Sequence, residues 1–163
     1  MSTWIGVDGG HDNRWELEKL AIEFHETLLP AARLVCAHVV DHHHAMSFML
    51  PVPPSEHAIT ALLEQGFGVA VHGTDRPRLA GPDALRRGAL AAALAHRGRR
   101  EGRALRFPGH RVLGGRHGVC DILAFSAIEQ VLPAGTTRVD TKGNLQPHFT
   151  EGRLVLDLGW SSA

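Results

Sequence analysis

The sequence predicts an α/β fold in which parallel strands are covered by helices. Short apolar runs alternate along the chain with segments of helical periodicity, and these segments are long enough to form crossovers between parallel strands. In addition, 44% of the 163 residues are hydrophobic, which is enough to bury the core of one domain. We therefore expect a single α/β domain over residues 1–163.

The first strand and the first helix are predicted by an apolar run and a capping pattern. Thr3–Val7 (TWIGV) is the strand candidate. Asn13 can cap the helix, with Glu16 three residues later as in a capping box, and Pro30 lies near its end. The apolar stripe of this helix consists of Leu17, Leu20, Ala21, Phe24 and Leu28.

The later elements follow from similar signals. Arg33–Val40 is the second strand, and Ser55 can cap a helix that runs to Gln65. The remaining expected elements are a strand at Phe67–Val71 that ends before His72, a helix from Pro82 toward His96, a strand at Arg103–Phe107, a helix at Ile122–Leu132 and a strand at Arg153–Leu158.

Polar side chains follow the ends of these strands. The carboxyl ends of parallel strands meet at one edge of a sheet, where ligands bind. We therefore expect one cleft to contain Asp8, Asp41 with His42 to His44, His72 and Arg106. A carboxylate and imidazoles around one point suit zinc, which lowers the pKa of bound water to about 7 and supports amide or ester hydrolysis.

The metal-ligand candidates come from a chain with twelve histidines and no tyrosine. His72 is the first candidate, and Asp8 can act as ligand or general base. The set of candidates that could complete the site is His11, Asp12, Asp41 and His44. A purely structural role is the alternative for several of these residues. Asp8 can form a turn, His72 can end a strand, and the DHHH segment can be a solvated cluster.

Two longer stretches resemble a known family. These stretches are LLEQGFGVAVHGTDRP (Leu62–Pro77) and the following RLAGPDALRRGALAAALAHRGRREGRALRFPGHR (Arg78–Arg111). They resemble the middle of polysaccharide deacetylases of the NodB-homology type, in which a strand ends in a histidine-bearing turn and a later strand ends in an Arg-x-Pro segment. IGVDGG and GRLVLDLGW are similar to the first motif and the late strand of that family.

The resemblance implies a distorted (β/α) barrel and metal-dependent hydrolysis of an N-acetyl or related amide of a carbohydrate-like substrate. It implies that Asp8 is the base or a metal ligand, that His72 binds the metal, and that Arg106 orients the base. Three departures are visible: Val7 occupies the place of a second aspartate, Arg76 stands near the place of a second histidine, and the last histidine motif has no room. A barrel of this length would be open or incomplete, because eight-stranded barrels typically need about 250 residues.

Two other functions remain open at this point. The same fold could bind a sugar or another small polar ligand without hydrolysis, and VHGT (Val71–Thr74) also looks like the histidine-bearing strand of NAD-using ADP-ribosyl transferring enzymes. The basic segment Arg97–Arg103 is interpreted as a solvated loop, with a weak phosphate contact as the alternative, and His117 with Cys120 is a minor metal alternative.

Composition and charge limit the partners. Lysine plus arginine and aspartate plus glutamate are equal at 17 each, so we expect no nucleic-acid or membrane-surface partner. The segment MSTWIGVDGG lacks the pattern of a secretory signal, which predicts a cytoplasmic protein. A homo-oligomer is a further expectation, because an open sheet needs its edge covered.

Overall fold

The computed structural model describes residues 2–111, 113, 115–140 and 145–159. Its helices are α1 (Arg14–Thr27), α2 (Glu56–Glu64), α3 (Asp83–Arg97) and α4 (Val119–Phe125). The large sheet consists of β1 (Thr3–His11), β2 (Leu34–Val40), β3 (His43–Leu50), β4 (Gly68–His72), β5 (Arg78–Ala80), β6 (Arg103–Arg106), β8 (Gln130–Leu132), β10 (His148–Thr150) and β11 (Arg153–Asp157). A second, two-stranded sheet pairs β7 (Arg116–Gly118) with β9 (Arg138–Asp140).

The predicted parallel fold is wrong. The nine strands form an open sheet in the order β5-β4-β1-β3-β2-β6-β10-β11-β8, and within the described chain only the β8–β11 pair is parallel. The remaining neighbours pair in antiparallel fashion. The protein therefore has an α+β architecture with one large antiparallel sheet, and the expected distorted or incomplete (β/α) barrel is not formed.

A missed strand explains most of this error. The segment that follows Val40 turns back at once, because Asp41 and His42 both adopt positive φ values, 45° and 69°. Two central residues with positive φ form the tight turn that suits the twist of a hairpin. The chain then returns as β3, which lies between β1 and β2 and is antiparallel to both. The expected crossover from one parallel strand to the next is therefore replaced by a hairpin.

The local predictions for the first two helices are confirmed. The Asn13 side chain accepts hydrogen bonds from the backbone amides of Trp15 and Glu16 at 2.8 and 3.2 Å. Ser55 caps α2 by accepting a hydrogen bond from the Ala58 amide at 3.1 Å. The expected helix at Ile122–Leu132 is wrong in extent, since α4 ends at Phe125 and Gln130–Leu132 forms β8.

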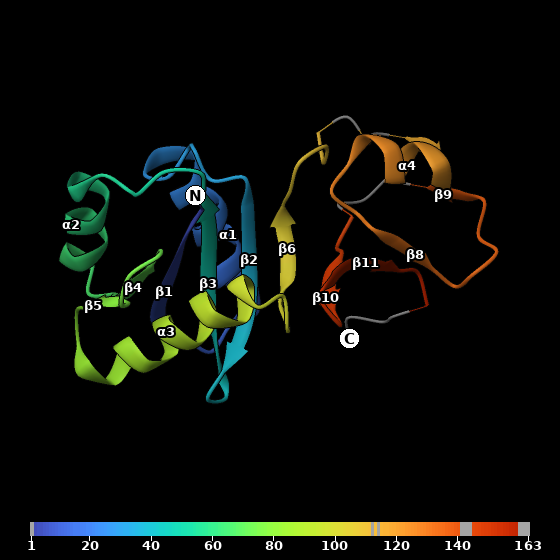
Figure 1. The fold of residues 1–163 in the computed structure, drawn as a ribbon. Coiled ribbons are helices and arrows are strands. Elements are labelled where there is room, and N and C mark those ends of the chain that lie inside the picture. Colours follow the sequence, from blue (N-terminus) through green and yellow to red (C-terminus); the bar gives the residue numbers. More distant parts are fainter. Residues whose placement is uncertain (1, 112, 114, 141–144, 160–163) are drawn as a thin grey trace.

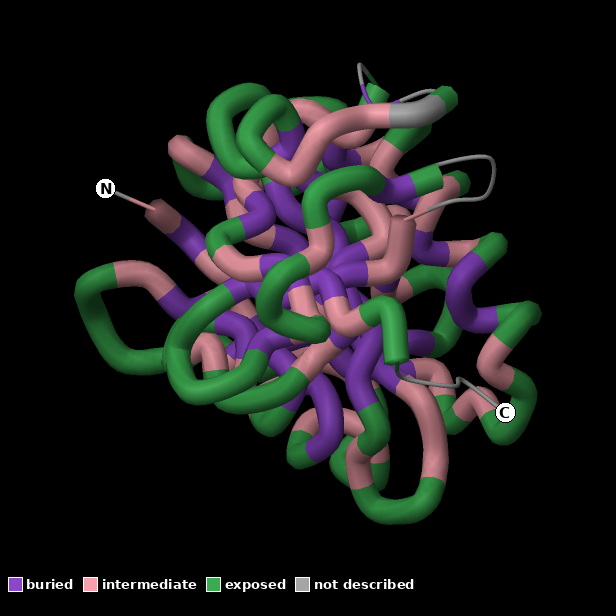
Figure 2. Tube along the Cα trace, turned by 90° about the vertical axis from the view of Figure 1, so that its right-hand side faces the viewer, coloured by how far each residue is buried: buried purple, intermediate pink, exposed green. Residues whose placement is uncertain are grey.

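Helices cover both faces of the sheet's first half (Figure 1). Helices α1 and α2 pack on one face over a core that includes Leu17, Phe24, Ile59, Leu62, Ile5 and Phe48. Helix α3 packs on the opposite face, where Ala89 and Ala93 contact Ala70 of β4. Strands β4-β1-β3-β2 with α1 and α2 thus form a β-α-β-β-α-β unit. Figure 2 shows the buried segments converging on the middle of the molecule, with exposed loops around them.

A second core lies under the later strands. It includes Leu34 and Cys36 of β2, Ala104 of β6, Ile122 of α4, and Leu154 and Leu156 of β11. Strand β2 contributes to both cores, and its pairing with β6 continues the sheet from one core to the other. Among the described residues, no helix is both long enough and apolar enough to cross a membrane.

Candidate functional site

The predicted site residues do not converge. Asp8 pairs with Gly68 and Trp4 pairs with His72 on the antiparallel strands β1 and β4. Asp8 and His72 are therefore separated by four strand positions, or about 14 Å along the strands at roughly 3.4 Å per residue. Arg106 ends β6, on the far side of β3 and β2, where it contacts His110 and Glu26. The expected common edge is absent because the strands alternate in direction.

Asp8 is fully buried under α3 and has two internal partners. Its Oδ1 accepts the amide hydrogen of Gly10 at 2.8 Å, and its Oδ2 lies 2.6 Å from Nε2 of His43. Gly88 of α3 faces this carboxylate so closely that a Cβ atom there would overlap Oδ2. Burial alone would lower the pKa of His43, but the hydrogen bond and charge of Asp8 raise it above its ordinary value. The structure thus places Asp8 in an ion pair.

His72 supports the end of α3. It is largely buried on the α3 face of β4, and its Nε2 lies 2.5 Å from Arg97. Burial and the positive charge of Arg97 lower the pKa of His72, which keeps the imidazole neutral at neutral pH. Arg97 also lies over the ring of Trp4, 5.6 Å from its centroid.

The other metal-ligand candidates do not gather around one point, although His11 and His44 are cross-strand neighbours. His11 stacks on Phe67, His44 pairs with His11 across β1 and β3, and Asp41 lies in the hairpin turn. Asp12 is exposed. Within the described parts of the chain, no group of three or more His, Cys, Asp and Glu side chains could hold a metal ion. The described part of the chain thus does not bring the expected zinc ligands together.

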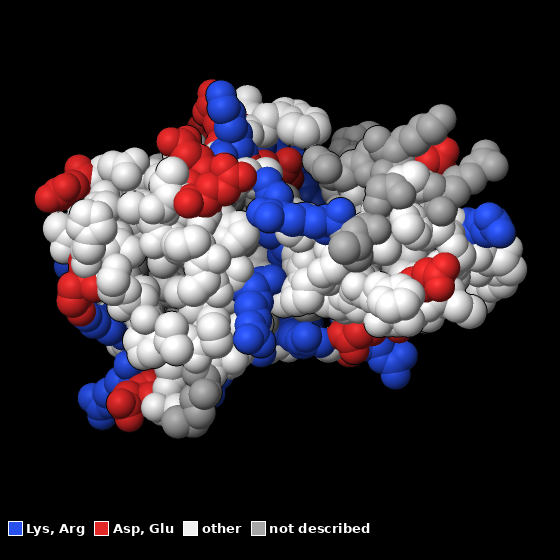
Figure 3. Space-filling view, turned by 90° about the horizontal axis from the view of Figure 1, so that it is seen from above, with Lys and Arg blue, Asp and Glu red and all other residues white. Residues whose placement is uncertain are grey.

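The basic segment that follows α3 is partly occupied by internal contacts. Arg97 contacts His72, Arg99 contacts Glu129 at 2.5 Å and the ring of Phe149, and Arg103 pairs with Glu18. Figure 3 shows lysine and arginine side chains along the middle of one face of the molecule, with acidic side chains beside them. These contacts connect the segment, expected to be a solvated loop, to β4, β10 and α1.

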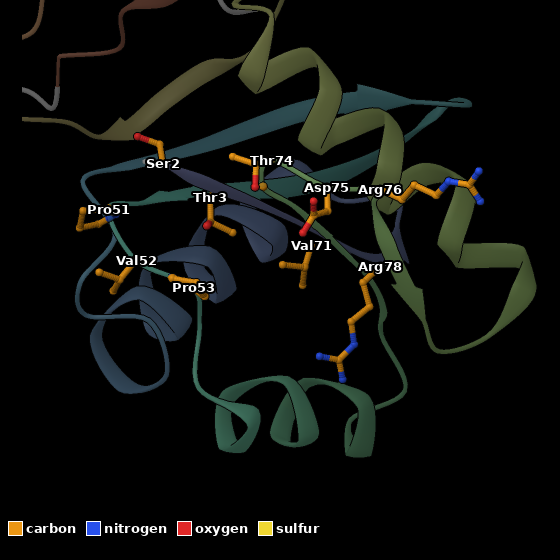
Figure 4. A pocket seen from close by; sticks show the side chains of 11 residues that line it. Ser2, Thr3, Pro51, Val52, Pro53, Val71, Thr74, Asp75, Arg76 and Arg78 are labelled. Atoms are coloured by element: carbon orange, nitrogen blue, oxygen red, sulfur yellow. The ribbon is translucent and has the colours of Figure 1, made fainter.

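A pocket of about 530 Å³ lies at the opposite end of β4 from Asp8. Its walls come from the start of β1, the loop between β3 and α2, and the turn that connects β4 to β5 (Figure 4). The lining residues are Ser2, Thr3, Pro51, Val52, Pro53, Val71, Gly73, Thr74, Asp75, Arg76 and Arg78. The turn belongs to the HGTDRP segment in which sequence analysis singled out His72, but the histidine itself points to the α3 face.

The pocket combines polar and apolar walls. Figure 4 shows Asp75 directed toward the space beside Val71, whereas Arg78 extends toward α2 and Arg76 extends away from the pocket. Arg78 is held by Glu56 of α2 through two hydrogen bonds of 2.7 and 3.1 Å. This ion pair neutralises Arg78, so Asp75 and the hydroxyl group of Thr3 remain as polar groups that face the cavity.

Sequence reasoning missed most of the pocket residues. The turn from Gly73 to Pro77 carried a visible signal, since it combines small, polar and proline residues directly after a strand. Thr3 and the prolines of the β3–α2 loop join this turn through pairing of β1 with β3 and β4, which is not visible in the sequence.

Comparisons with protein-family models, curated proteins and solved structures give no match. The resemblance to polysaccharide deacetylases therefore stays a prediction.

Proposed function

We propose that this protein binds a small, uncharged polar ligand of the carbohydrate class in the pocket at the end of β4. The observation that carries the proposal is the composition of the pocket walls, where Asp75 and Thr3 face Val71 and the prolines of the β3–α2 loop across one cavity. A volume of about 530 Å³ lies in the range that small-molecule sites occupy.

The walls match the surface of a sugar. A pyranose presents hydroxyl groups at its rim and C–H groups on its faces, so it can use both kinds of wall at once. The Asp75 carboxylate can accept hydrogen bonds from hydroxyl groups, and the Thr3 hydroxyl can donate or accept one. Val52 and Pro53 offer apolar contact to a ring face. Val52 is 55% exposed, so it is free for such a contact.

The charges of the pocket favour a neutral ligand over an anion. Arg78 already forms a bidentate pair with Glu56, and Asp75 adds a negative charge to the cavity. Arg76 points outward. An anionic ligand would have to displace Glu56 or approach Asp75, and each of these steps weakens binding.

Binding is better supported than hydrolysis. The groups expected to carry the hydrolytic reaction, Asp8 and His72, are separated along the sheet and lie on its α3 face, away from the pocket. Metal-dependent hydrolysis and NAD-dependent ADP-ribosyl transfer both stay untested predictions. Elemental analysis of untagged protein grown with zinc, manganese or cobalt tests the former, and protection from thermal unfolding by NAD tests the latter.

The binding proposal is tested by saturation-transfer NMR with N-acetylglucosamine, glucose and inorganic phosphate. We expect saturation transfer to at least one sugar but not to phosphate. Asp75→Ala removes a charged acceptor, which is worth about 1.5–3 kcal/mol, so the dissociation constant should rise tenfold or more. Asp12→Ala, which changes an exposed aspartate outside the pocket, should leave binding unchanged.

Two outcomes would contradict the proposal. The first is the lack of transfer to any sugar in the wild-type protein. The second is equal binding by wild-type protein and the Asp75→Ala variant, which would place the ligand elsewhere.

A further inference from the structure

Two histidines of neighbouring strands lie opposite each other at the end of the sheet that carries the β2–β3 hairpin (Figure 1). His11, the last residue of β1, is the register partner of His44, near the start of β3. Residues directly opposite in an antiparallel pair have Cβ atoms about 4.5–5.5 Å apart and side chains on the same face of the sheet. We call these two residues the His11–His44 pair.

Both members of the His11–His44 pair lie on the face that α1 and α2 cover. Met46 and Phe48 belong to the core on that face, and His44 continues their alternate positions along β3. The ring of His11 stacks on Phe67 of the same core at a centroid distance of 6.0 Å. The core contacts therefore place the two imidazoles on one face, in agreement with the pairing register.

The other histidines of the DHHH segment do not join this pair. Side chains alternate along a strand, so His43 points to the opposite face, where its Nε2 lies 2.6 Å from Asp8. His42 lies in the hairpin turn and is exposed. Within this segment, His44 is the histidine that faces His11, and the two rings come from different strands.

The imidazoles of the His11–His44 pair have ring nitrogens available to a ligand. Nδ1 of His11 is buried and has no hydrogen-bond partner among the described residues. A buried polar atom without a partner is unfavourable and needs an explanation, such as an ion or a water molecule. A neutral imidazole keeps one bare nitrogen that can accept a metal ion. Both residues are half-buried, so an ion from solvent can reach the pair.

The His11 ring is held in place by its surroundings. A Cβ atom at Gly9 would lie 2.7 Å from Cε1 of His11 and 2.4 Å from Cε1 of Phe67, so the backbone of Gly9 packs directly on both rings. A side chain whose orientation is fixed before binding loses less conformational entropy when it binds an ion. This packing favours His11 as a metal ligand.

We propose that the His11–His44 pair binds a divalent transition-metal ion of the zinc, nickel and copper class, which connects β1 to β3. Imidazole nitrogens suit these ions, whereas magnesium and calcium need oxygen ligands, which the pair lacks. Two protein ligands are one fewer than a catalytic zinc site provides, so water fills the remaining positions and the site is one of binding.

This ion site is separate from the other sites considered above. Neither histidine of the pair lines the pocket at the end of β4. Asp8 and His72, which were expected to form the hydrolytic centre, lie on the opposite face of the sheet, beneath α3. Ion binding by the pair is therefore independent of sugar binding and of the predicted hydrolysis.

The test is a titration of metal-free, untagged wild-type protein, labelled with ¹⁵N at histidine, with Zn²⁺. Ring ¹⁵N shifts identify the imidazoles that bind the ion. We expect one ring nitrogen of His11 and one of His44 to shift together, with formation of a 1:1 complex, and no such shifts with Mg²⁺. Shifts confined to other histidines, a spectrum that does not change, or an equal response to Mg²⁺ would overturn the proposal.

Matched variants separate the cross-strand site from binding by the contiguous histidines. Even outer-shell partners of metal ligands contribute about 10–100-fold in affinity, so His11→Gln and His44→Gln should each weaken Zn²⁺ binding about tenfold or more. His42→Gln changes an exposed residue of the same segment and should leave the affinity unchanged. Affinity that falls in His42→Gln but not in His11→Gln would place the ion on the DHHH segment and overturn the proposal.

Discussion

The pair formed by Asp8 and His43 is the clearest case of a residue whose sequence context misled prediction. An aspartate before two glycines at a strand end suggested a catalytic or metal-binding group. The structure buries this carboxylate completely and gives it a histidine from the neighbouring strand. A buried carboxylate needs hydrogen-bond donors or a counter-charge, and His43 supplies both.

This pair predicts a pH dependence of stability. Since the pKa of folded His43 is raised, its protonation stabilises the folded state fully below the unfolded value of about 6.5, and this contribution is lost as pH rises through the folded pKa. Asp8→Asn should reduce the loss of unfolding free energy above pH about 6.5 by on the order of 1 kcal/mol. Urea unfolding at a series of pH values measures it.

The control for this prediction is Asp12→Asn, which changes an exposed aspartate of the same segment. It should keep the wild-type pH profile. Identical profiles for wild-type protein and Asp8→Asn would show that the pair contributes nothing to stability.

At the scale of elements, helix α3 depends on small residues in β1. A Cβ atom at Gly6 would overlap the carbonyl oxygen of Ala89, which is a backbone atom and cannot move alone. Gly6→Ala should therefore displace α3 and lower the free energy of unfolding by about 2–4 kcal/mol. Gly73→Ala is the matched control, because its nearest contact would be 3.7 Å away. Equal unfolding energies for the two variants would refute the close packing.

In the turn of the β2–β3 hairpin, we expect a substitution to glycine to stabilise the protein. His42 holds a φ of 69°, a conformation that is unfavourable by roughly 1–2 kcal/mol for non-glycine residues. His42→Gly removes this strain but loses about 0.5–1 kcal/mol through chain entropy, so we expect a net stabilisation of up to about 1 kcal/mol. His57→Gly, in the first turn of α2, should destabilise the protein instead. Thermal unfolding of both variants checks the signs, and a destabilised His42→Gly protein would contradict the assigned turn.

At the scale of the whole molecule, the sequence predicted those features that depend on residues close together in the chain. The caps at Asn13 and Ser55 and the helical spacing that follows them are local signals, and both helices form as expected. The direction of strand pairing depends on contacts between distant segments. The apolar run AMSFML could have indicated β3, but the Asp41–His42 turn lacks the usual glycine signal of a hairpin.

The pocket, too, was predictable only in its local part and not in its contacts between distant segments. The turn after His72 was recognisable as unusual, and it does line the pocket. The partners of this turn, such as Thr3 and Val52, come from segments that only the sheet order brings together. The buried contacts that join His38, Ser47 and His96 had no sequence signal, because these residues lie far apart in the chain. The expected homo-oligomer and cytoplasmic location stay predictions.

The central claim is that the pocket at the end of β4, and not the edge near Asp8, is the binding site. The most direct test is a ¹H–¹⁵N correlation spectrum of wild-type protein titrated with N-acetylglucosamine. We expect shift changes concentrated at Thr3, Val52 and the turn from Gly73 to Asp75. Changes centred on Asp8 and His43, or a spectrum that does not change, would contradict it.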